Sequence, residues 1–240
     1  MHGASRTYLA VCFAILISAC GGGNGSPASM PPPTANYDLQ AGMAKMVTNG
    51  LSSNVGLSGS VTVNGVSTAF TGSGTFTRPP AVSATFNGTA AMSQSTSVAG
   101  SITAAGQTSQ YSTSVTDYYA SSDSAFLGEV SAGEYDVAQA PISFPTTVTG
   151  GSSGMLGTLS RYTDSTMSVS LGTAQVSYST QTPVDPGSPI GIVMTTKIFD
   201  TQNTLVETDV TNYTMTSSNV ISLAGASAQN QSGMLTVTVQ

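Results

Sequence analysis

Beyond Leu51, the hydrophobic pattern changes to a period of two, with apolar side chains alternating with polar ones, many of them serine and threonine. This period is typical of β-strands whose two faces differ. Asn64-Gly65, between Val63 and Val66, is a strong hairpin signal because a type I′ turn needs positive φ at both central residues. The pattern predicts strands at 57–63, 66–77, 81–92, 95–104, 108–119, 125–130, 134–139, 155–162, 165–171, 173–180, 190–199, 204–216, 219–224 and 233–239.

One segment, residues 38–48, has helical spacing instead. Its apolar side chains recur every three or four residues, Asp38 stands where an N-cap is needed, and Asn49-Gly50 gives a stop signal. Short strands, regular turns and a single short helix predict an all-β fold. We expect an antiparallel meander that forms a sandwich or a partly open barrel, with the helix at its N-terminal side.

The first twenty residues are typical of a targeting signal rather than of a structural element of the folded domain. Arg6 precedes an apolar run over residues 9–17, which is much shorter than the ~20 residues of a membrane-spanning helix, and small residues follow it. Ile17-Ser18-Ala19-Cys20 resembles the lipobox of bacterial lipoproteins. An ordinary signal-peptidase site nearby, which would leave Cys20 free or discarded, is the alternative.

The resemblance covers the leader alone, and it implies a signal peptide over 1–19 and lipidation of Cys20. In that family the cysteine carries a diacylglyceryl group and usually an N-acyl chain such as palmitate, which together anchor the protein durably in the membrane. Because Gly21 rather than an aspartate follows Cys20, the resemblance also implies the outer membrane of a Gram-negative cell envelope. The globular body could then face the periplasm or the cell surface.

Residues 20–36 are rich in glycine, serine, alanine and proline, a composition typical of a flexible tether. No comparable segment recurs, so 37–240 is predicted to be a single β-rich domain. Cys12 and Cys20 are the only cysteines, so no disulfide can form in that domain. With 5 lysines and arginines against 11 acidic residues and a net charge of −6, the chain has no basic surface for nucleic acid.

The residues that usually carry catalysis or bind metals are nearly absent. The sequence 150–154, GGSSG, matches the nucleophile-elbow pattern around Ser152, but the only histidine is His2 in the leader. Without histidine or cysteine in the body, only oxygen-ligated Ca²⁺ or Mg²⁺ would remain, and Asp200-Thr201-Gln202-Asn203 is better explained as a hairpin turn. We therefore expect no catalytic residue, no metal site and no cofactor.

Two carboxylate pairs lie on single strand faces, Glu134 with Asp136 and Glu207 with Asp209. Such pairs could act as acid and base in glycoside cleavage, although solvent-exposed positions are the simpler expectation. The cationic side chains of the body, spread along the sequence, are Lys45, Arg78, Arg161 and Lys197.

These observations predict a lipid-anchored envelope protein whose β domain is a non-enzymatic structural or interaction module. The alternative is a periplasmic or outer-membrane binding module for a lipid or small apolar ligand. Its lining would come from apolar side chains of the helix and the first strands, namely Met43, Met46, Phe70, Phe76, Phe86 and Phe126. The membrane is the partner expected through Cys20, and the sequence identifies neither a protein partner nor a ligand.

Overall fold

The computed structural model describes residues 35–183, 185 and 187–240. The predicted signal peptide and the predicted lipidation site Cys20 lie outside the described residues, as does the predicted tether apart from Ala35 and Asn36.

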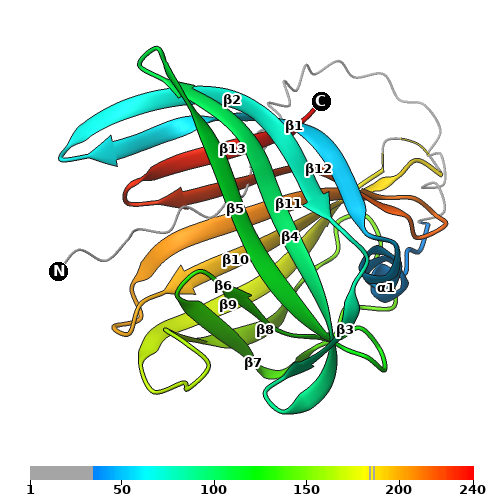
Figure 1. The fold of residues 1–240 in the computed structure, drawn as a ribbon. Coiled ribbons are helices and arrows are strands. Elements are labelled where there is room, and N and C mark those ends of the chain that lie inside the picture. Colours follow the sequence, from blue (N-terminus) through cyan, green and yellow to red (C-terminus); the bar gives the residue numbers. More distant parts are fainter. Residues whose placement is uncertain (1–34, 184, 186) are drawn as a thin grey trace, which may run out of the picture.

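The described residues form a closed, twelve-strand antiparallel barrel (Figure 1). Strands β4 to β13 follow one another around the sheet, and β13 pairs with β1, which pairs with β2. The barrel closes where β2 pairs with β4. In chain order the strands are β1 (Leu51–Val63), β2 (Val66–Arg78), β3 (Val82–Phe86), β4 (Thr89–Ala104), β5 (Gln107–Ala120), β6 (Phe126–Ser131), β7 (Glu134–Ile142), β8 (Ser153–Tyr162), β9 (Ser170–Gln181), β10 (Ile190–Phe199), β11 (Leu205–Met215), β12 (Ile221–Asn230) and β13 (Gly233–Val239).

The sheet of the described residues has thirteen strands but twelve positions, because β2 and β3 share one neighbour. Strand β4 pairs with β2 over residues 97–104 and with β3 over residues 89–93. The all-β meander and the N-terminal helix are therefore confirmed. Of the two architectures left open by the sequence, the barrel is correct, and it is closed rather than partly open.

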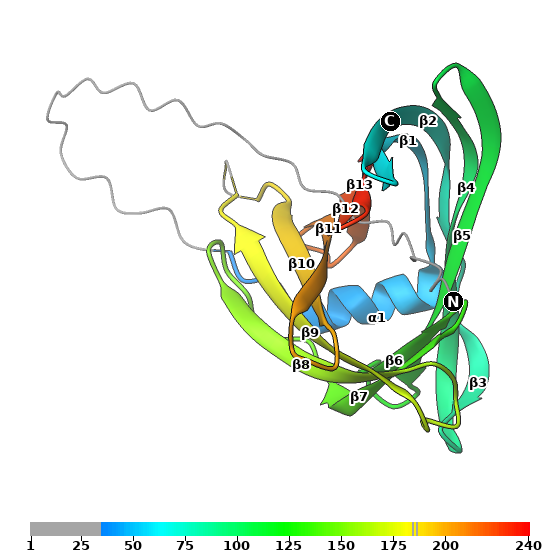
Figure 2. The same ribbon diagram turned by 90° about the vertical axis from the view of Figure 1, so that its left-hand side faces the viewer.

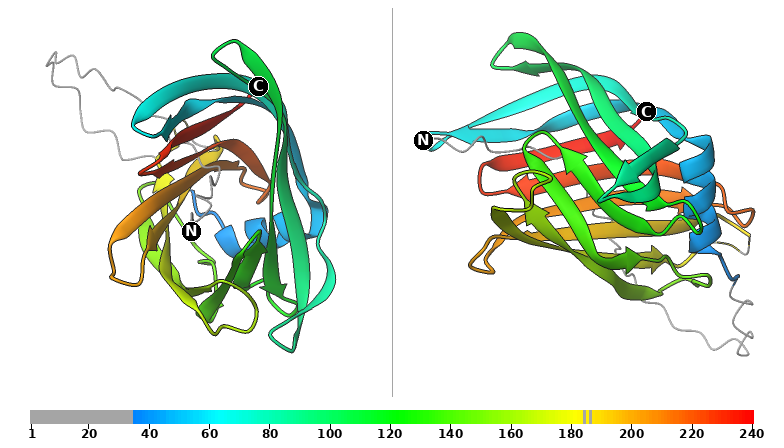
Figure 3. Two further views of the ribbon diagram at one scale, coloured as in Figure 1. Left: turned by 60° about the vertical axis from the view of Figure 1, so that its left-hand side comes forward. Right: turned by 60° about the horizontal axis from the view of Figure 1, so that its bottom comes forward.

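Helix α1 (Leu39–Asn49) lies across one end of the barrel (Figures 2 and 3). The predicted caps are confirmed, since Asp38 Oδ1 accepts a hydrogen bond from Ala41 N at 2.9 Å, and Gly50 has a φ of 74° and donates to Met46 O. Gly42 allows close packing on the barrel, because a Cβ there would lie 2.5 Å from Met215 Sδ. Among the described residues, no helix has the length and apolar character to cross a membrane.

The main hydrophobic core lies between α1 and the inward faces of the strands next to it. The segment between β7 and β8 helps to hold the helix in place: Tyr37 N donates to Val148 O at 2.9 Å, and Val148 N donates to Tyr37 O at 2.8 Å. The fully buried members of this core include Tyr37, Leu39, Val55, Val148, Ile190, Ile192, Met215 and Val237.

One strand prediction is wrong in an informative way. The segment 81–92 was expected to be a single strand, but Asn87 and Gly88 have φ values of 48° and 74° and form the turn between β3 and β4. This is the same Asn-Gly signal that marks the turn at Asn64-Gly65. The segment 165–171 is also not a strand for most of its length, since β9 begins at Ser170.

The β3–β4 hairpin carries an aromatic cluster on the outer wall of the barrel. The ring of Phe86 stacks on Tyr118 with 4.5 Å between centroids and on Tyr135 with 5.2 Å. Gly128 of β6 makes room for that ring, because a Cβ at this position would lie 2.7 Å from Phe86 Cζ. Phe86 therefore stabilises the outside of the wall and does not face the interior.

Candidate functional site

The barrel interior contains a cavity of about 250 Å³. Much of its wall is apolar, with side chains from the helix and from strands around the whole barrel. These residues include Met43, Phe76, Val98, Phe126, Ile142, Phe144, Leu159, Ala174, Val176, Met194, Ile198, Ala226 and Val237. Of the six residues expected to line a ligand site, Met43, Phe76 and Phe126 do line the cavity, whereas Met46, Phe70 and Phe86 do not.

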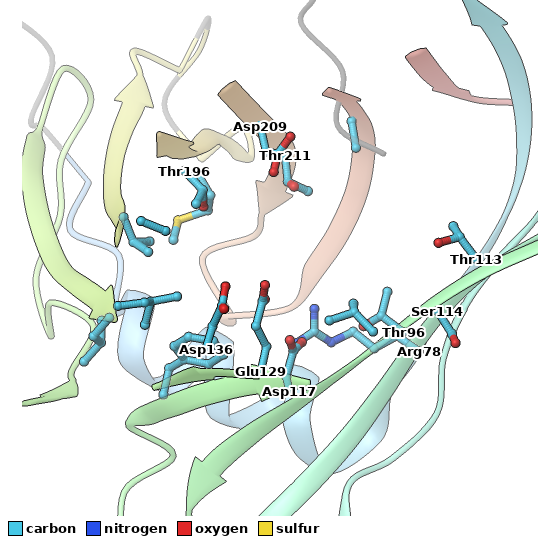
Figure 4. A pocket seen from close by; sticks show the side chains of 18 of the residues that line it. Arg78, Thr96, Thr113, Ser114, Asp117, Glu129, Asp136, Thr196, Asp209 and Thr211 are labelled. Carbon is cyan, nitrogen blue, oxygen red and sulfur yellow. The ribbon is translucent and has the colours of Figure 1, made fainter. Parts of the chain in front are cut away.

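Charged side chains also line this cavity (Figure 4). Strand alternation explains their orientation: Asp117 shares the inward face of β5 with Tyr119, and Asp209 shares that of β11 with Tyr213. Asp136 on β7 is only 2% exposed and Glu207 on β11 only 9%. The expectation that the two same-strand carboxylate pairs are solvent-exposed is therefore wrong. The term interior polar cluster is used below for Arg78, Asp117, Glu129, Glu134, Asp136, Arg161, Glu207 and Asp209.

At one side of the interior polar cluster, Arg78 is held by three neighbouring side chains. Its Nη2 donates to Asp117 Oδ2 at 2.6 Å and to the Tyr119 hydroxyl, and its Nε donates to Gln94 Oε1 at 2.7 Å. Burial opposes the guanidinium charge, but Tyr119 and Asp117 outweigh it and raise the pKa of Arg78 above its usual value. Arg78 is therefore a permanent cation with its carboxylate partner in place.

Gln94 connects this arginine to the helix. Its Nε2 donates to Met46 O at 3.0 Å and to Pro79 O at 2.9 Å, and the side chain is 1% exposed. Met46 O lies in the last turn of α1 and already accepts a hydrogen bond from Gly50 N at 2.9 Å, so the amide of Gln94 adds a second donor to it. The amide thus binds the end of the helix from the barrel wall and links α1 to the interior polar cluster.

A second arginine holds the two carboxylates of β7. Arg161 Nη2 lies 2.8 Å from Glu134 Oε1, and Arg161 Nε lies 3.3 Å from Asp136 Oδ2. Arg161 is 6% exposed, so these ion pairs are shielded from water. The two arginines, 83 residues apart in the sequence, are thus both buried and do not form part of the outer surface.

The remaining carboxylates of the cluster are Glu129, Glu207 and Asp209. Burial, followed by the nearby charges of Asp136 and Asp117, raises the pKa of Glu129 well above its usual value. Burial and the charge of Glu207 do the same for Asp209. Burial also raises the pKa of Glu207, against a hydrogen bond from Asn230 Nδ2 to Glu207 Oε2 at 3.3 Å.

Among the residues that the structure describes, no N–H or hydroxyl group donates to three buried oxygens of this region, which are Glu207 Oε1, Asp209 Oδ1 and Thr96 Oγ1. Buried polar atoms normally form hydrogen bonds with protein groups or bound molecules, so three such oxygens in one barrel interior are unusual. Asp209 and Thr96 line the cavity. The arrangement can accept hydrogen bonds and positive charge from a molecule inside the barrel.

The other sequence candidates lie elsewhere. Ser152 is in the turn before β8, where its Oγ accepts a hydrogen bond from Thr149 N at 2.9 Å, and Gly151 has a φ of 83°. Asp200 closes the predicted turn, with Oδ1 accepting from Gln202 N and Thr204 N. Within residues 35–183, 185 and 187–240, no group of three or more His, Cys, Asp or Glu side chains has a metal-binding arrangement.

The sequence contains a pattern that indicates the inward orientation of some of these carboxylates. Glu207 and Asp209 stand an even number of positions from Tyr213 and Met215, and Asp117 stands two positions from Tyr119, so each set falls on one face of its strand. Polar positions in phase with large apolar ones on a strand point into the same interior. Glu129 could not be found this way, because the bulge around Gly128 shifts the register of β6.

Comparison with protein-family models, with curated protein sequences and with solved structures gave no match for this chain.

Proposed function

We propose that this protein is a lipid-anchored envelope protein whose barrel is a non-enzymatic binding module for a small molecule. The cavity inside the barrel is the observation that carries the proposal. A barrel of about eight strands is just filled by its own side chains, and larger barrels enclose space for ligands. The twelve-strand barrel leaves about 250 Å³, below the 300–1,000 Å³ typical of sites for drug-sized molecules. A small ligand fits this volume.

The lining also supports a binding role. Apolar walls with a few converging polar groups are typical of small-molecule sites, because the walls supply affinity and the polar groups fix the orientation. Burying carboxylates destabilises the folded domain. A domain that served only as a spacer would not need them, so their presence favours a binding role. The ligand class expected from the sequence, a lipid or small apolar molecule, accounts for the walls but not for the interior polar cluster.

The binding role is tested by filling the cavity. Thr196 lines it from β10, so Thr196→Phe places a ring inside, and Thr195→Phe on the opposite face of the same strand is the matched control. Native mass spectrometry of the full-length protein, extracted with a mild detergent, should show a bound small molecule in the wild type and in Thr195→Phe but not in Thr196→Phe. A bare protein mass in repeated preparations of the wild type would contradict the proposal.

The anchor is tested separately by metabolic labelling with radioactive palmitate. The leader motif Ile17-Ser18-Ala19-Cys20 supports attachment at Cys20. Label should enter the wild type and Cys12→Ala, which removes the other cysteine, and should be lost in Cys20→Ala. Equal labelling of all three proteins would contradict lipidation at Cys20.

A second function, an interaction module, is favoured by the exposed end of the β1–β2 hairpin. Val63 and Val66 are 60% and 67% exposed, and Val61 is 41% exposed. These side chains extend to the tip at Asn64-Gly65. An interaction role predicts that Val63→Ser with Val66→Ser abolishes crosslinking to an envelope protein without affecting a ligand in the barrel.

A further inference from the structure

We infer that the barrel takes a small organic cation, an amine with an apolar body, whose charge lies between Glu129 and Asp209. This inference rests on the proposed binding function and adds the chemical class of the ligand. It follows from the charges inside the barrel, from buried oxygens that lack donors, and from the walls.

Carboxylates outnumber cations among the side chains that face the cavity from the described strands. Strand β5 contributes Asp117, β6 contributes Glu129, β7 contributes Glu134 and Asp136, and β11 contributes Asp209. Glu207, two positions before Asp209 on β11, is buried beside this cavity without lining it. The cation that lines the cavity is Arg78 from β2, and the lining hydroxyls of Tyr119 and Tyr213 are neutral. Arg161 from β8 pairs with the lining carboxylates Glu134 and Asp136. Strands β9 and β10 present no titratable side chain to the cavity.

Both arginines already have carboxylate partners. Arg78 lies 2.6 Å from Asp117, and Arg161 lies 2.8 Å from Glu134 and 3.3 Å from Asp136. In the described part of the chain, no arginine or lysine lies within 4 Å of the carboxylates of Glu129, Glu207 or Asp209. The charge of Arg161 still lowers the pKa of Glu207 and of Asp209, but it acts across a distance and not through an ion pair.

Glu129 and Asp209 lie on different walls of the cavity. Their strands, β6 and β11, are separated by β7 to β10 around the sheet, and Figure 4 shows the two side chains with the cavity between them. Among the described residues, no N–H or hydroxyl group donates to Asp209 Oδ1 or to Oε1 of the neighbouring Glu207, whose side chain is 9% exposed. The two carboxyl groups hydrogen-bond to each other instead, which raises the pKa of Asp209. An ammonium group has three donors and no acceptor, so it fits this set of oxygens.

The rest of the wall indicates an organic cation rather than a hydrated ion. Met194, Val176 and Leu159 border the same cavity as Asp209 and provide apolar contacts. No arrangement of His, Cys, Asp and Glu for a metal ion occurs among the described residues. A hydrocarbon body against these side chains and an ammonium on the carboxylates would occupy both parts of the cavity.

Without a ligand, protons neutralise these carboxyl groups. Burial raises the pKa of Glu129 and of Asp209 well above the usual value, so each holds a proton at pH values where an exposed carboxyl is ionised. A bound ammonium favours the ionised form, so binding releases a proton to solvent. The affinity for a cation should therefore increase with pH until the carboxyls are ionised in the free protein.

The test is isothermal titration calorimetry of the full-length protein with three probes of similar shape: phenethylamine, 2-phenylethanol and phenylacetate. We expect phenethylamine to bind about tenfold or more tightly than the alcohol, because hydrogen bonds between ionised groups are stronger than those of a neutral hydroxyl. Phenylacetate should not bind. Repeating the amine titration in phosphate and in Tris should give different observed enthalpies, because the released proton is taken up by the buffer.

The variants Glu129→Gln and Asp209→Asn should each weaken phenethylamine binding about tenfold or more and reduce the proton release. Both keep the shape of the side chain and remove a buried acid, so the fold should persist, as circular dichroism will verify. Asp123→Asn is the control, because Asp123 is exposed and the amide keeps the acceptor for Ala125 N.

Failure of phenethylamine to bind, or binding of the alcohol or the acid as tightly as the amine, would overturn the inference. That result is distinct from failure of the proposed function. If native mass spectrometry still shows a ligand that Thr196→Phe removes, the barrel is a binding module for a molecule that is not a cation. If both experiments are negative, the binding function fails as well.

Discussion

Replacing Gln94 with methionine should loosen the attachment of α1 to the barrel wall. Methionine has a similar length and volume, so the packing changes little, but every hydrogen bond of the amide is lost. The change leaves Arg78 Nε without its acceptor and removes the donor to Met46 O and Pro79 O. The side chain is 1% exposed, so water cannot easily replace it.

The expected cost follows from these contacts. A hydrogen bond to a charged group contributes roughly 1.5–3 kcal/mol and a neutral one roughly 1 kcal/mol. Because Met46 O keeps its hydrogen bond from Gly50 N, the main losses are the bonds to Arg78 Nε and Pro79 O, and Gln94→Met should lower the free energy of unfolding by about 3 kcal/mol. For a domain of this size the melting temperature should fall by roughly 6–12 °C.

Urea denaturation followed by circular dichroism measures this cost. Gln139→Met is the matched control, because Gln139 is exposed on β7 and bonds only weakly to Ser160 Oγ at 3.2 Å, so its effect should stay within about 0.5 kcal/mol. A change of less than about 1 kcal/mol for Gln94→Met would refute the conclusion that this amide joins the helix to the wall.

Three further predictions concern the interior and the outer wall. Arg161→Met should lower the free energy of unfolding by about 3–5 kcal/mol, because it removes the cation from two buried carboxylates; urea denaturation at pH 7 will measure it. Because the pKa of Glu129 is raised in the folded state, the folded protein keeps a proton that the unfolded chain loses near pH 4. The free energy of unfolding should therefore fall as pH rises from there towards the folded-state pKa. Glu129→Gln should flatten this pH dependence of stability between pH 4.5 and 8. Phe86→Ala should cost about 3 kcal/mol through loss of both tyrosine stacks, with Phe86→Leu costing less, as thermal denaturation will show.

The parts of the fold that depend on local chemistry could be predicted from the sequence. Asp38 and Gly50 mark the ends of α1 because capping needs particular side chains at particular positions. Asn64-Gly65 marks a hairpin for the same kind of reason. The error over 81–92 arose because the turn at Asn87-Gly88 interrupts a segment that alternates on both sides.

The closure and the interior could not be predicted in this way. Closure depends on β4 pairing with β2, a contact that no local pattern encodes, and on β3 sharing the position of β2. The two faces of these strands are also hard to distinguish, since serine and threonine occupy much of the outer wall and polar side chains also point inward. Arg78 and Arg161 therefore look like scattered surface residues in the sequence, although both are buried in the folded chain.

The most direct test of a ligand inside the barrel is methyl NMR with labelled methionines. Met43 and Met194 line the cavity, whereas Met155 and Met234 are 60% and 45% exposed outside it. With phenethylamine bound, we expect nuclear Overhauser effects from its ring protons to the methyl groups of Met43 and Met194 and none to those of Met155 and Met234. Effects confined to Met155 or Met234 would contradict binding inside the barrel.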